Sequence, residues 1–231
     1  MASRERDGSQ PPLDYPPYKS TRLRHPKEPL VYLPHAVTEA TGPQVIGAEP
    51  GELDADLTRQ HDGEPIGERI VVSGRVLDAG GRPLWRTLVE VWQANAAGRY
   101  LHARDQWPAP IDPNFSGAGR CITDDEGRYS FTTVKPGPYP WGNHHNAWRP
   151  AHIHFSLLGE AFAQRLVTQM YFPGDPLFPH DPIFNSVRDE RARERMVSRF
   201  SIEATQPDWA TAYEWDIVLR GPGETPFEEA H

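Results

Sequence analysis

The stretch Val134–Phe155, VKPGPYPWGNHHNAWRPAHIHF, brings a proline-flanked tyrosine, an arginine and a pair of histidines into one short segment. Its last five residues, AHIHF, predict a strand on which the imidazoles of His152 and His154 project from the same face, because side chains two apart on a strand point the same way. Such a pair can bind one metal ion. Tyr139 lies between two prolines that restrict its backbone, and Arg149 adds a permanent positive charge beside the histidines.

The two histidines alone do not identify which metal would bind. Imidazole binds zinc, copper and iron, and a His-x-His pair on a strand also occurs as ordinary polar surface. A phenol has a pKa of about 10 and binds as phenolate only to a strongly acidic ion. Because ferric iron prefers anionic oxygen donors, the proline-flanked Tyr139 favours Fe(III).

Two rival kinds of site fit the residues poorly. A cupin metal site needs a glutamate soon after the second histidine and a glycine ahead of the first, whereas here Glu160 lies six residues beyond His154 and position 146 is asparagine. A hydrolase with a nucleophile elbow needs a Gly-x-Ser-x-Gly turn. The sequence contains no such turn.

The composition predicts many short strands and turns. Of 231 residues, 25 are proline, 19 are glycine and 37% are hydrophobic, which favours short strands joined by rigid turns. The formal net charge is -8, without a basic cluster. Binding to nucleic acid or to an anionic membrane surface is therefore disfavoured.

Features of compartment agree with a cytoplasmic protein. The sequence has no apolar run of about eighteen residues that could cross a membrane, and its first residues, MASRERDGSQPP, lack the apolar stretch of a signal peptide. The single cysteine, Cys121, agrees with a reducing compartment. We expect it to be a small buried apolar residue.

Runs rich in β-branched and aromatic residues alternate with turn signals along the chain. We predict strands at residues 69–77, 87–93, 121–123, 128–134, 151–155, 164–172 and 212–219. The first two are joined by the turn sequence DAGGRP, and we expect a hairpin or a Greek-key neighbour pair. The spacing predicts an all-β fold, a β-sandwich of mixed or antiparallel short strands with long loops.

Segments outside the strands complete the predicted organisation. Residues 1–65 are proline-rich with little periodicity, which predicts an N-terminal arm that wraps its own domain or a partner. Residues 66–231 then form the catalytic sandwich. Within them, residues 187–199 predict one short surface helix, charged on most faces. We expect the acidic tail beyond residue 219 to be a surface extension.

Six motifs extend this interpretation, because they resemble those of the intradiol ring-cleaving dioxygenases in the same order and spacing. Within this family, residues from about Tyr18 to Leu219 closely resemble the catalytic β chains of the protocatechuate 3,4-dioxygenase type, which contain non-haem ferric iron. The motifs that carry it are LVEVWQANAAGRY, IDPNFSGAGRC, TTVKPGPYPW, WRPAHIHFSL, TQMYFPGDPL and DIVLRG.

The resemblance implies four iron ligands, two of them tyrosines thirty-nine positions apart in the family and in this sequence. They are Tyr100, Tyr139, His152 and His154. It also implies that Tyr139 takes up a substrate proton, and that Arg149 stabilises charge on the ring. Without the resemblance, Tyr100 would be an ordinary loop aromatic.

Further family positions line the substrate and oxygen pocket. They correspond to Tyr18, Trp141, Gln169 and Ile183, although packing in the core explains Trp141 and Ile183 equally well. His144 and His145 match no ligand position and receive no role.

The implied reaction is cleavage of protocatechuate (3,4-dihydroxybenzoate) by O2 to 3-carboxy-cis,cis-muconate, a step of aromatic catabolism in the β-ketoadipate pathway. The resemblance also implies a homologous α subunit in a hetero-oligomer, which supplies a basic residue for the substrate carboxylate. Relatives acting on catechol or hydroxyquinol carry an N-terminal helical dimerisation region, whereas this chain starts with a proline-rich arm. The alternatives are activity on catechol or hydroxyquinol, or a non-catalytic transthyretin-like binding module.

Overall fold

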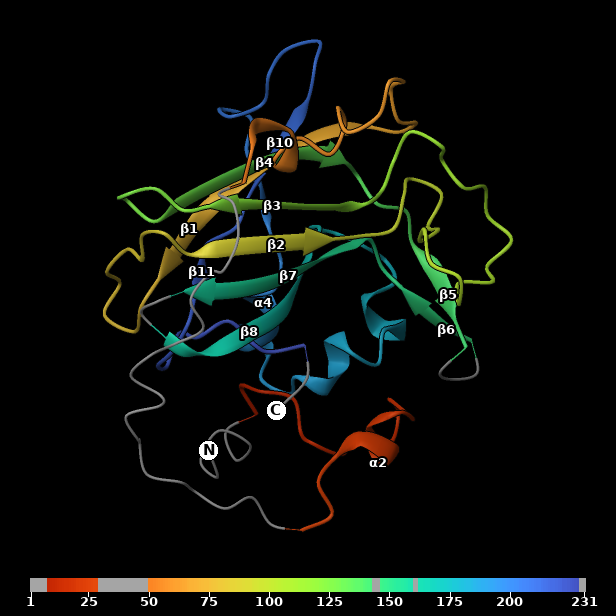
Figure 1. Ribbon diagram of the computed structural model, residues 1–231. Helices are drawn as coiled ribbons and strands as arrows, with labels where there is room; N and C mark the ends of the chain where they lie inside the picture. Colours follow the sequence, from red (N-terminus) through yellow and green to blue (C-terminus); the bar gives the residue numbers. More distant parts are fainter. Residues whose placement is uncertain (1–7, 29–49, 143–145, 160–161, 229–231) are drawn as a thin grey trace.

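The computed structural model describes residues 8–28, 50–142, 146–159 and 162–228, and their strands form two packed sheets and a small hairpin (Figure 1). The first sheet is built around one long strand, which pairs antiparallel with β4 on one edge and parallel with β10 and then β11 on the other. Strand β9 extends the sheet beyond β10. The members described are β1 (Arg69–Leu77), β4 (Arg128–Val134), β9 (Arg199–Phe200), β10 (Thr211–Glu214) and β11 (Ile217–Val218).

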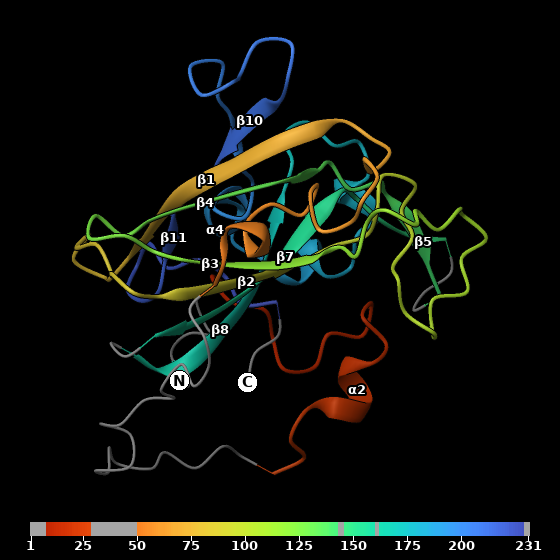
Figure 2. The same ribbon diagram turned by 45° about the horizontal axis from the view of Figure 1, so that its top comes forward.

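The second sheet is antiparallel throughout, in the order β3-β2-β7-β8. It faces the first sheet across the core, which the turned view shows most clearly (Figure 2). This arrangement confirms the predicted all-β sandwich. Its strands are β2 (Leu88–Trp92), β3 (Ala118–Ile122), β7 (His152–Gly159) and β8 (Phe162–Tyr171).

Short elements surround the two sheets. The hairpin β5-β6 lies at one end of the sandwich in both views (Figures 1 and 2). In the described ranges the longest helix has five residues, whereas about twenty are needed to cross a lipid bilayer. The short elements are α2 (Thr21–Arg24), η1 (Glu52–Asp54), β5 (Tyr139–Trp141), β6 (Ala147–Arg149), η2 (Phe178–His180), η3 (Phe184–Ser186) and α4 (Glu190–Glu194).

Alternating side chains of the two sheets make the core between them. In β4 exposed and buried positions alternate, with Tyr129 and Phe131 pointing inward. Cys121 on β3 joins this core as a free, buried thiol, as predicted. Burial raises the pKa of Cys121 to about 12, so the group stays neutral and packs as an apolar side chain.

The predicted strand at 212–219 is wrong in one respect, because it is interrupted between β10 and β11. A Cβ atom on Gly74 of β1 would lie 1.8 Å from the backbone oxygen of Trp215. The two backbone segments can approach this closely only because residue 74 is glycine. The carboxylate of Asp216 then accepts a hydrogen bond from the backbone N–H of Arg75 at 2.8 Å.

The prediction that residues 69–77 and 87–93 are sheet neighbours is also wrong. Strand β1 lies in the first sheet and β2 in the second. The connection between them crosses from one layer of the sandwich to the other. Each strand instead pairs with segments distant in sequence, which a local turn signal cannot reveal.

The predicted helix at 187–199 is much shorter, and one side of it is buried. Asp189 caps α4 by accepting a hydrogen bond from the Arg191 N–H at 2.9 Å. The helix ends before Met196, whose backbone oxygen instead accepts a hydrogen bond from the Tyr171 N–H of β8 at 2.8 Å. Ala192 and Met196 pack against Tyr171 and Phe184.

Segments before the first strand and after the last strand pack onto the sandwich. Leu57, within the segment predicted to be an arm, is fully buried in the main core. The tail was expected to be a surface extension, and this is wrong for its described part, because Glu224 and Thr225 are buried. The backbone of Glu228 donates a hydrogen bond to the Val167 carbonyl on β8 at 2.8 Å.

We predict that Phe155→Ala destabilises the protein by about 3–5 kcal/mol, because it leaves a cavity at the centre of the core. Phe155 is 0% exposed and its ring contacts those of Tyr129, Phe131 and Trp215. The free energy of unfolding from denaturant titration is the measurement. The control is Ile202→Ala at a side chain that is 66% exposed, and equal effects of the two changes would contradict the assignment of the core.

Candidate metal centre

The strand β7 sends its alternate side chains in two directions. Ile153 and Phe155 enter the core between the sheets. His152 and His154 therefore project from the other face of their sheet, yet only 2% and 8% of their surfaces are exposed. Other segments must cover this outer face.

Sheet register places further functional groups beside the histidines. His154 lies directly opposite Trp92 on β2 and Gln169 on β8, and His152 lies opposite Tyr171 on β8. Directly opposed residues share a face of the sheet. The Trp92 ring is stacked on the imidazole of His154, with centroids 4.8 Å apart and an interplanar angle of 6°.

The two tyrosines reach the histidines because two turns lock together. The Gly137 N–H donates to the Asn95 carbonyl at 2.9 Å. A Cβ atom on Gly98, whose φ is 77°, would lie 2.3 Å from the Pro138 carbonyl oxygen, so glycine is required there. Tyr100 follows the first turn and Tyr139 the second, and their rings meet edge to face at 5.5 Å.

Four polar atoms converge at this point. The Tyr100 hydroxyl oxygen lies 3.1 Å from His154 Nε2, and the Tyr139 hydroxyl oxygen lies 3.3 Å from His152 Nε2. The two imidazole rings are 4.9 Å apart between centroids. The four residues that the sequence analysis selected as ligands are thus brought together by elements far apart in the chain.

The remaining imidazole nitrogens are held by acceptors. Nδ1 of His152 donates to the Pro150 carbonyl oxygen at 2.7 Å, and Nδ1 of His154 donates to the Glu228 carboxylate at 2.9 Å. A neutral imidazole carries one proton. In the neutral form of each ring, this arrangement leaves Nε2 unprotonated and facing a phenol oxygen, as metal ligands require.

Burial favours the neutral forms of His152, Tyr100 and Tyr139 when no metal ion is present. It lowers the pKa of His152 well below its usual value, with Arg149 and His154 adding to the effect. Burial also raises the pKa of Tyr100 well above its usual value and, opposed by Arg149, that of Tyr139. A buried phenolate here needs a nearby cation.

The donor set fits a hard, highly charged ion. Among the described residues, no group of three histidine, cysteine, aspartate or glutamate side chains could hold a metal ion. An ion at this point would thus depend on the phenol oxygens of Tyr100 and Tyr139. Phenolate oxygens with two imidazoles suit Fe(III).

Arg149 is buried beside these groups and belongs to an internal network. Its Nε lies 3.0 Å from the carboxylate of Asp181, with 4% and 0% of the two side chains exposed. Its Nη2 donates to Gln169 and, at 3.2 Å, to the Tyr171 hydroxyl. Its guanidinium also lies 5.5 Å from the centroid of the Trp141 ring. A permanent cation is therefore fixed close to the phenols.

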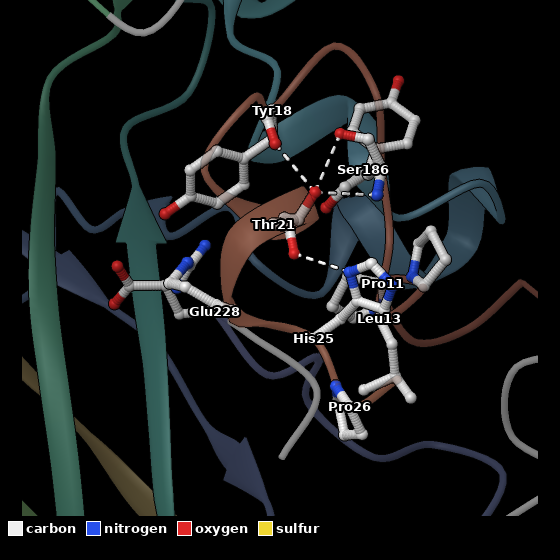
Figure 3. A pocket seen from close by; sticks show the side chains of 11 residues that line it. Pro11, Leu13, Tyr18, Thr21, His25, Pro26, Ser186 and Glu228 are labelled. Carbon is white, nitrogen blue, oxygen red and sulfur yellow. Dashed lines mark hydrogen bonds between the residues drawn. The ribbon is translucent and has the colours of Figure 1, made fainter. Parts of the chain in front are cut away.

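A cavity of about 470 Å³ lies between the N-terminal segment and the sandwich (Figure 3). None of the four donors lines it, but its lining residue Glu228 contacts His154. Tyr18, Arg24 and His25 line it from the arm, and Glu228 lines it from the tail. The Thr21 hydroxyl holds the arm in a turn by donating to the Tyr18 carbonyl at 2.8 Å.

Of the predicted pocket residues, Tyr18 lines this cavity, whereas Trp141, Gln169 and Ile183 are not among its lining residues. Tyr18 contacts Trp141 edge to face at 5.0 Å. Gln169 is fully buried beside His154, and Ile183 is buried behind Asp181, whose carboxylate accepts from the Ile183 N–H at 2.9 Å. His144 and His145 lie outside the described residues.

Comparisons with known proteins agree with this geometry. The family model "Dioxygenase" matches residues 40–221, and the model "Protocatechuate 3,4-dioxygenase beta subunit N terminal" matches residues 2–36. The chain is 60% identical over 223 residues to the protocatechuate 3,4-dioxygenase beta chain of Burkholderia cepacia, covering 95% of this chain and 94% of that protein. The chain belongs to the intradiol dioxygenase family. The resemblance seen in its motifs is confirmed.

Two further relatives extend the comparison. The protocatechuate 3,4-dioxygenase alpha chain of Pseudomonas putida is 29% identical over 208 residues, covering 86% of this chain and 98% of that one. In structure, the 3-chlorocatechol 1,2-dioxygenase of Rhodococcus opacus 1CP matches with a TM-score of 0.57 at 24% identity, covering 76% of this chain and 68% of that one. At that identity the match shows the sandwich fold alone.

Three groups at the centre of this intradiol dioxygenase were missed by the sequence analysis. Trp92 could have been found, because β2 alternates and Trp92 ends a strand on the same face as Glu90. Asp181 and Glu228 carry no signal in the sequence. One lies in a proline-rich loop and the other in an acidic tail, and only folding brings them to Arg149 and His154.

We predict that Asp181→Ala destabilises the metal-free protein by about 3–5 kcal/mol, because it leaves the buried guanidinium of Arg149 unpaired. Adding Arg149→Met should restore most of the loss, since an apolar side chain needs no counter-charge. Denaturant titration of both variants is the measurement. As a control, Arg75→Ala removes an exposed pair with Asp216 and should cost about 1 kcal/mol or less. Additive losses in the double variant would contradict the pairing.

Proposed function

We propose that this chain is the catalytic chain of a protocatechuate 3,4-dioxygenase, which cleaves 3,4-dihydroxybenzoate with O2 to 3-carboxy-cis,cis-muconate. Non-haem Fe(III) would be held by Tyr100, Tyr139, His152 and His154. The observation that carries the proposal is the convergence of two phenol oxygens and the Nε2 atoms of two imidazoles. The 60% identity to a protocatechuate 3,4-dioxygenase beta chain supports the substrate.

The iron would supply a Lewis acid for the catechol oxygens and a redox centre for the reaction with O2. The chain supplies the counter-charges. Two phenolates, from Tyr100 and Tyr139, offset most of the charge of a trivalent ion, and neutral imidazoles complete the set. A buried site with such a balance stabilises Fe(III) over a divalent ion.

Tyr139 is suited to take a proton from the substrate. Burial raises the pKa of its phenol above the usual value, although Arg149 opposes the shift. A Tyr139 phenolate released from a cation is therefore a strong base. We propose that its oxygen receives one catechol proton and holds it while the substrate is bound.

Arg149 is suited to stabilise negative charge that develops on the ring. Its guanidinium is held by Asp181 and Gln169 and cannot swing away to solvent. A fixed cation that requires no reorganisation is an effective electrostatic catalyst in a site shielded from water. Arg149 would thus act on the substrate without touching the metal.

The cavity explains selection of a carboxylated catechol. The Arg24 guanidinium lines the cavity and lies 4.7 Å from the centroid of the Tyr18 ring. If protocatechuate binds with its two hydroxyl groups toward Tyr139 and His152, its carboxylate, on the opposite side of the ring, would point toward Arg24. Arginine binds carboxylates by charge-assisted hydrogen bonds, whereas unsubstituted catechol has no group for Arg24.

We further propose that a homologous α chain completes the assembly in the cytoplasm. The similarity of this chain to an alpha chain as well as a beta chain supports a pair of related subunits. Arg24 and Leu23, on the arm, are exposed in the single chain, and a partner could cover them. The free thiol of Cys121 agrees with a reducing compartment.

The proposal is tested on protein purified with its co-expressed partner chain. We expect bound iron, a visible tyrosinate-to-Fe(III) band, and oxygen uptake that is faster with protocatechuate than with catechol or hydroxyquinol. Tyr139→Phe should retain iron, shift the band and slow substrate binding in rapid mixing, because the proton acceptor is lost. Colourless, iron-free protein without oxygen uptake would indicate a binding module instead, and faster uptake with another catechol would reassign the substrate.

Arg24→Ala should raise KM for protocatechuate about tenfold, because loss of one partly exposed charge-assisted contact costs about 1.4 kcal/mol. The KM for catechol should not change, since catechol has no carboxylate. The matched control is Arg22→Ala, which removes a neighbouring exposed cation that does not line the cavity. Equal effects of Arg24→Ala on both substrates would contradict the role in carboxylate recognition.

A further inference from the structure

The described end of the chain is attached along the edge of the second sheet. Strand β8 is the outer strand of that sheet. The Glu228 N–H donates to the Val167 carbonyl at 2.8 Å, and the Thr168 hydroxyl donates to the Pro226 carbonyl at 2.6 Å. These bonds fix the tail next to the strand that carries Gln169.

A side chain of the N-terminal arm holds the tail from its other side. The amide of Gln10 donates to the Glu224 carboxylate at 2.9 Å and accepts from the Phe227 N–H at 2.8 Å. Gln10 is 4% exposed, so both bonds are shielded from water and are correspondingly strong. The tail is thus clamped between the arm and β8.

The attached tail places the carboxylate of Glu228 at one edge of the His154 ring. Glu228 Oε2 lies 2.9 Å from His154 Nδ1, and the two side chains are 14% and 10% exposed. Trp92 stacks on one face of the ring. The opposite edge presents Nε2 to the Tyr100 oxygen at 3.1 Å. These contacts on one face and two edges oppose rotation of the imidazole.

The two imidazoles are supported unequally. His152 donates to an uncharged backbone carbonyl, that of Pro150, whereas His154 donates to a carboxylate. An ionised carboxylate can only accept, so it fixes the proton on Nδ1. An anionic acceptor also makes the opposite nitrogen a better donor to a metal than a neutral acceptor does.

We propose that Glu228 is a positioning residue, which holds His154 in its metal-binding tautomer and orientation, so that retention of iron depends on the tail of the chain. This inference rests on the proposed function, because it takes His154 to be an iron ligand. It assigns to the tail a role in the metal centre. Glu228 itself does not touch the ion or the substrate's reacting atoms.

The test compares Glu228→Gln and Glu228→Ala with the wild-type protein, each purified with its partner chain. The readouts are iron per catalytic chain, the rate of iron loss to a chelator, and the position of the visible band. Loss of a residue that supports a ligand typically weakens metal binding about 10–100-fold. We expect Glu228→Ala to lose iron faster than wild type by about that factor, and Glu228→Gln to fall between, since its amide can accept from Nδ1 without the charge.

The matched control is Glu224→Gln, which removes another buried carboxylate of the tail, keeps an acceptor for Gln10, and makes no contact with His154 among the described bonds. It should lose iron at the wild-type rate. Thermal unfolding of the metal-free variants shows whether each is folded. If Glu228→Ala is not folded, the isosteric Glu228→Gln decides the question.

The outcomes separate this inference from the proposed function. Wild-type rates of iron loss in both Glu228 variants would overturn the positioning role while the function stands. Equal acceleration in Glu224→Gln would also overturn it, because tail order and not the carboxylate would then be responsible. A wild-type protein that binds no iron would overturn the proposed function and this inference with it.

Discussion

The alternation of β7 is the constraint on which the rest of this structure depends. One strand serves two environments, because Ile153 and Phe155 fill the core while His152 and His154 face outward. The outward face is useful only if it is shielded from water. The two locked turns, the arm and the tail supply that cover, so the loops and chain ends are as necessary to the site as the sheets.

Two carboxylates from distant parts of the chain are the partners of buried groups in the site. Asp181 pairs with Arg149, and Glu228 pairs with His154. Because an unpaired buried charge is costly, the cation near the phenols requires such a partner. The same pairings hold the guanidinium and the imidazole in fixed positions. Stability and preorganisation therefore have one origin here.

The division of labour between sheet and arm also explains how related enzymes can differ. Strand β7, the β5-β6 hairpin and the loop after β2 carry the proposed metal ligands, and the arm lines the cavity with Tyr18, Arg24 and His25. Under the proposed function, a change in the arm would alter the cavity without changing any of the four donors. Matches to dioxygenases of low identity extend over the sandwich, while the N-terminal match is to a protocatechuate 3,4-dioxygenase beta subunit.

The sequence by itself determined the class of fold and predicted the chemical type of the site. Strand periodicity and turn residues are local properties, and a His-x-His pair specifies its own geometry once it is extended. Residue order alone could not place β1 and β2 in different sheets, shorten the helix at α4, or bring Asp181 and Glu228 to the buried cation and imidazole. Those contacts join residues up to 74 positions apart, and only the packed tertiary structure, in which burial makes an unpaired polar group costly, selects them.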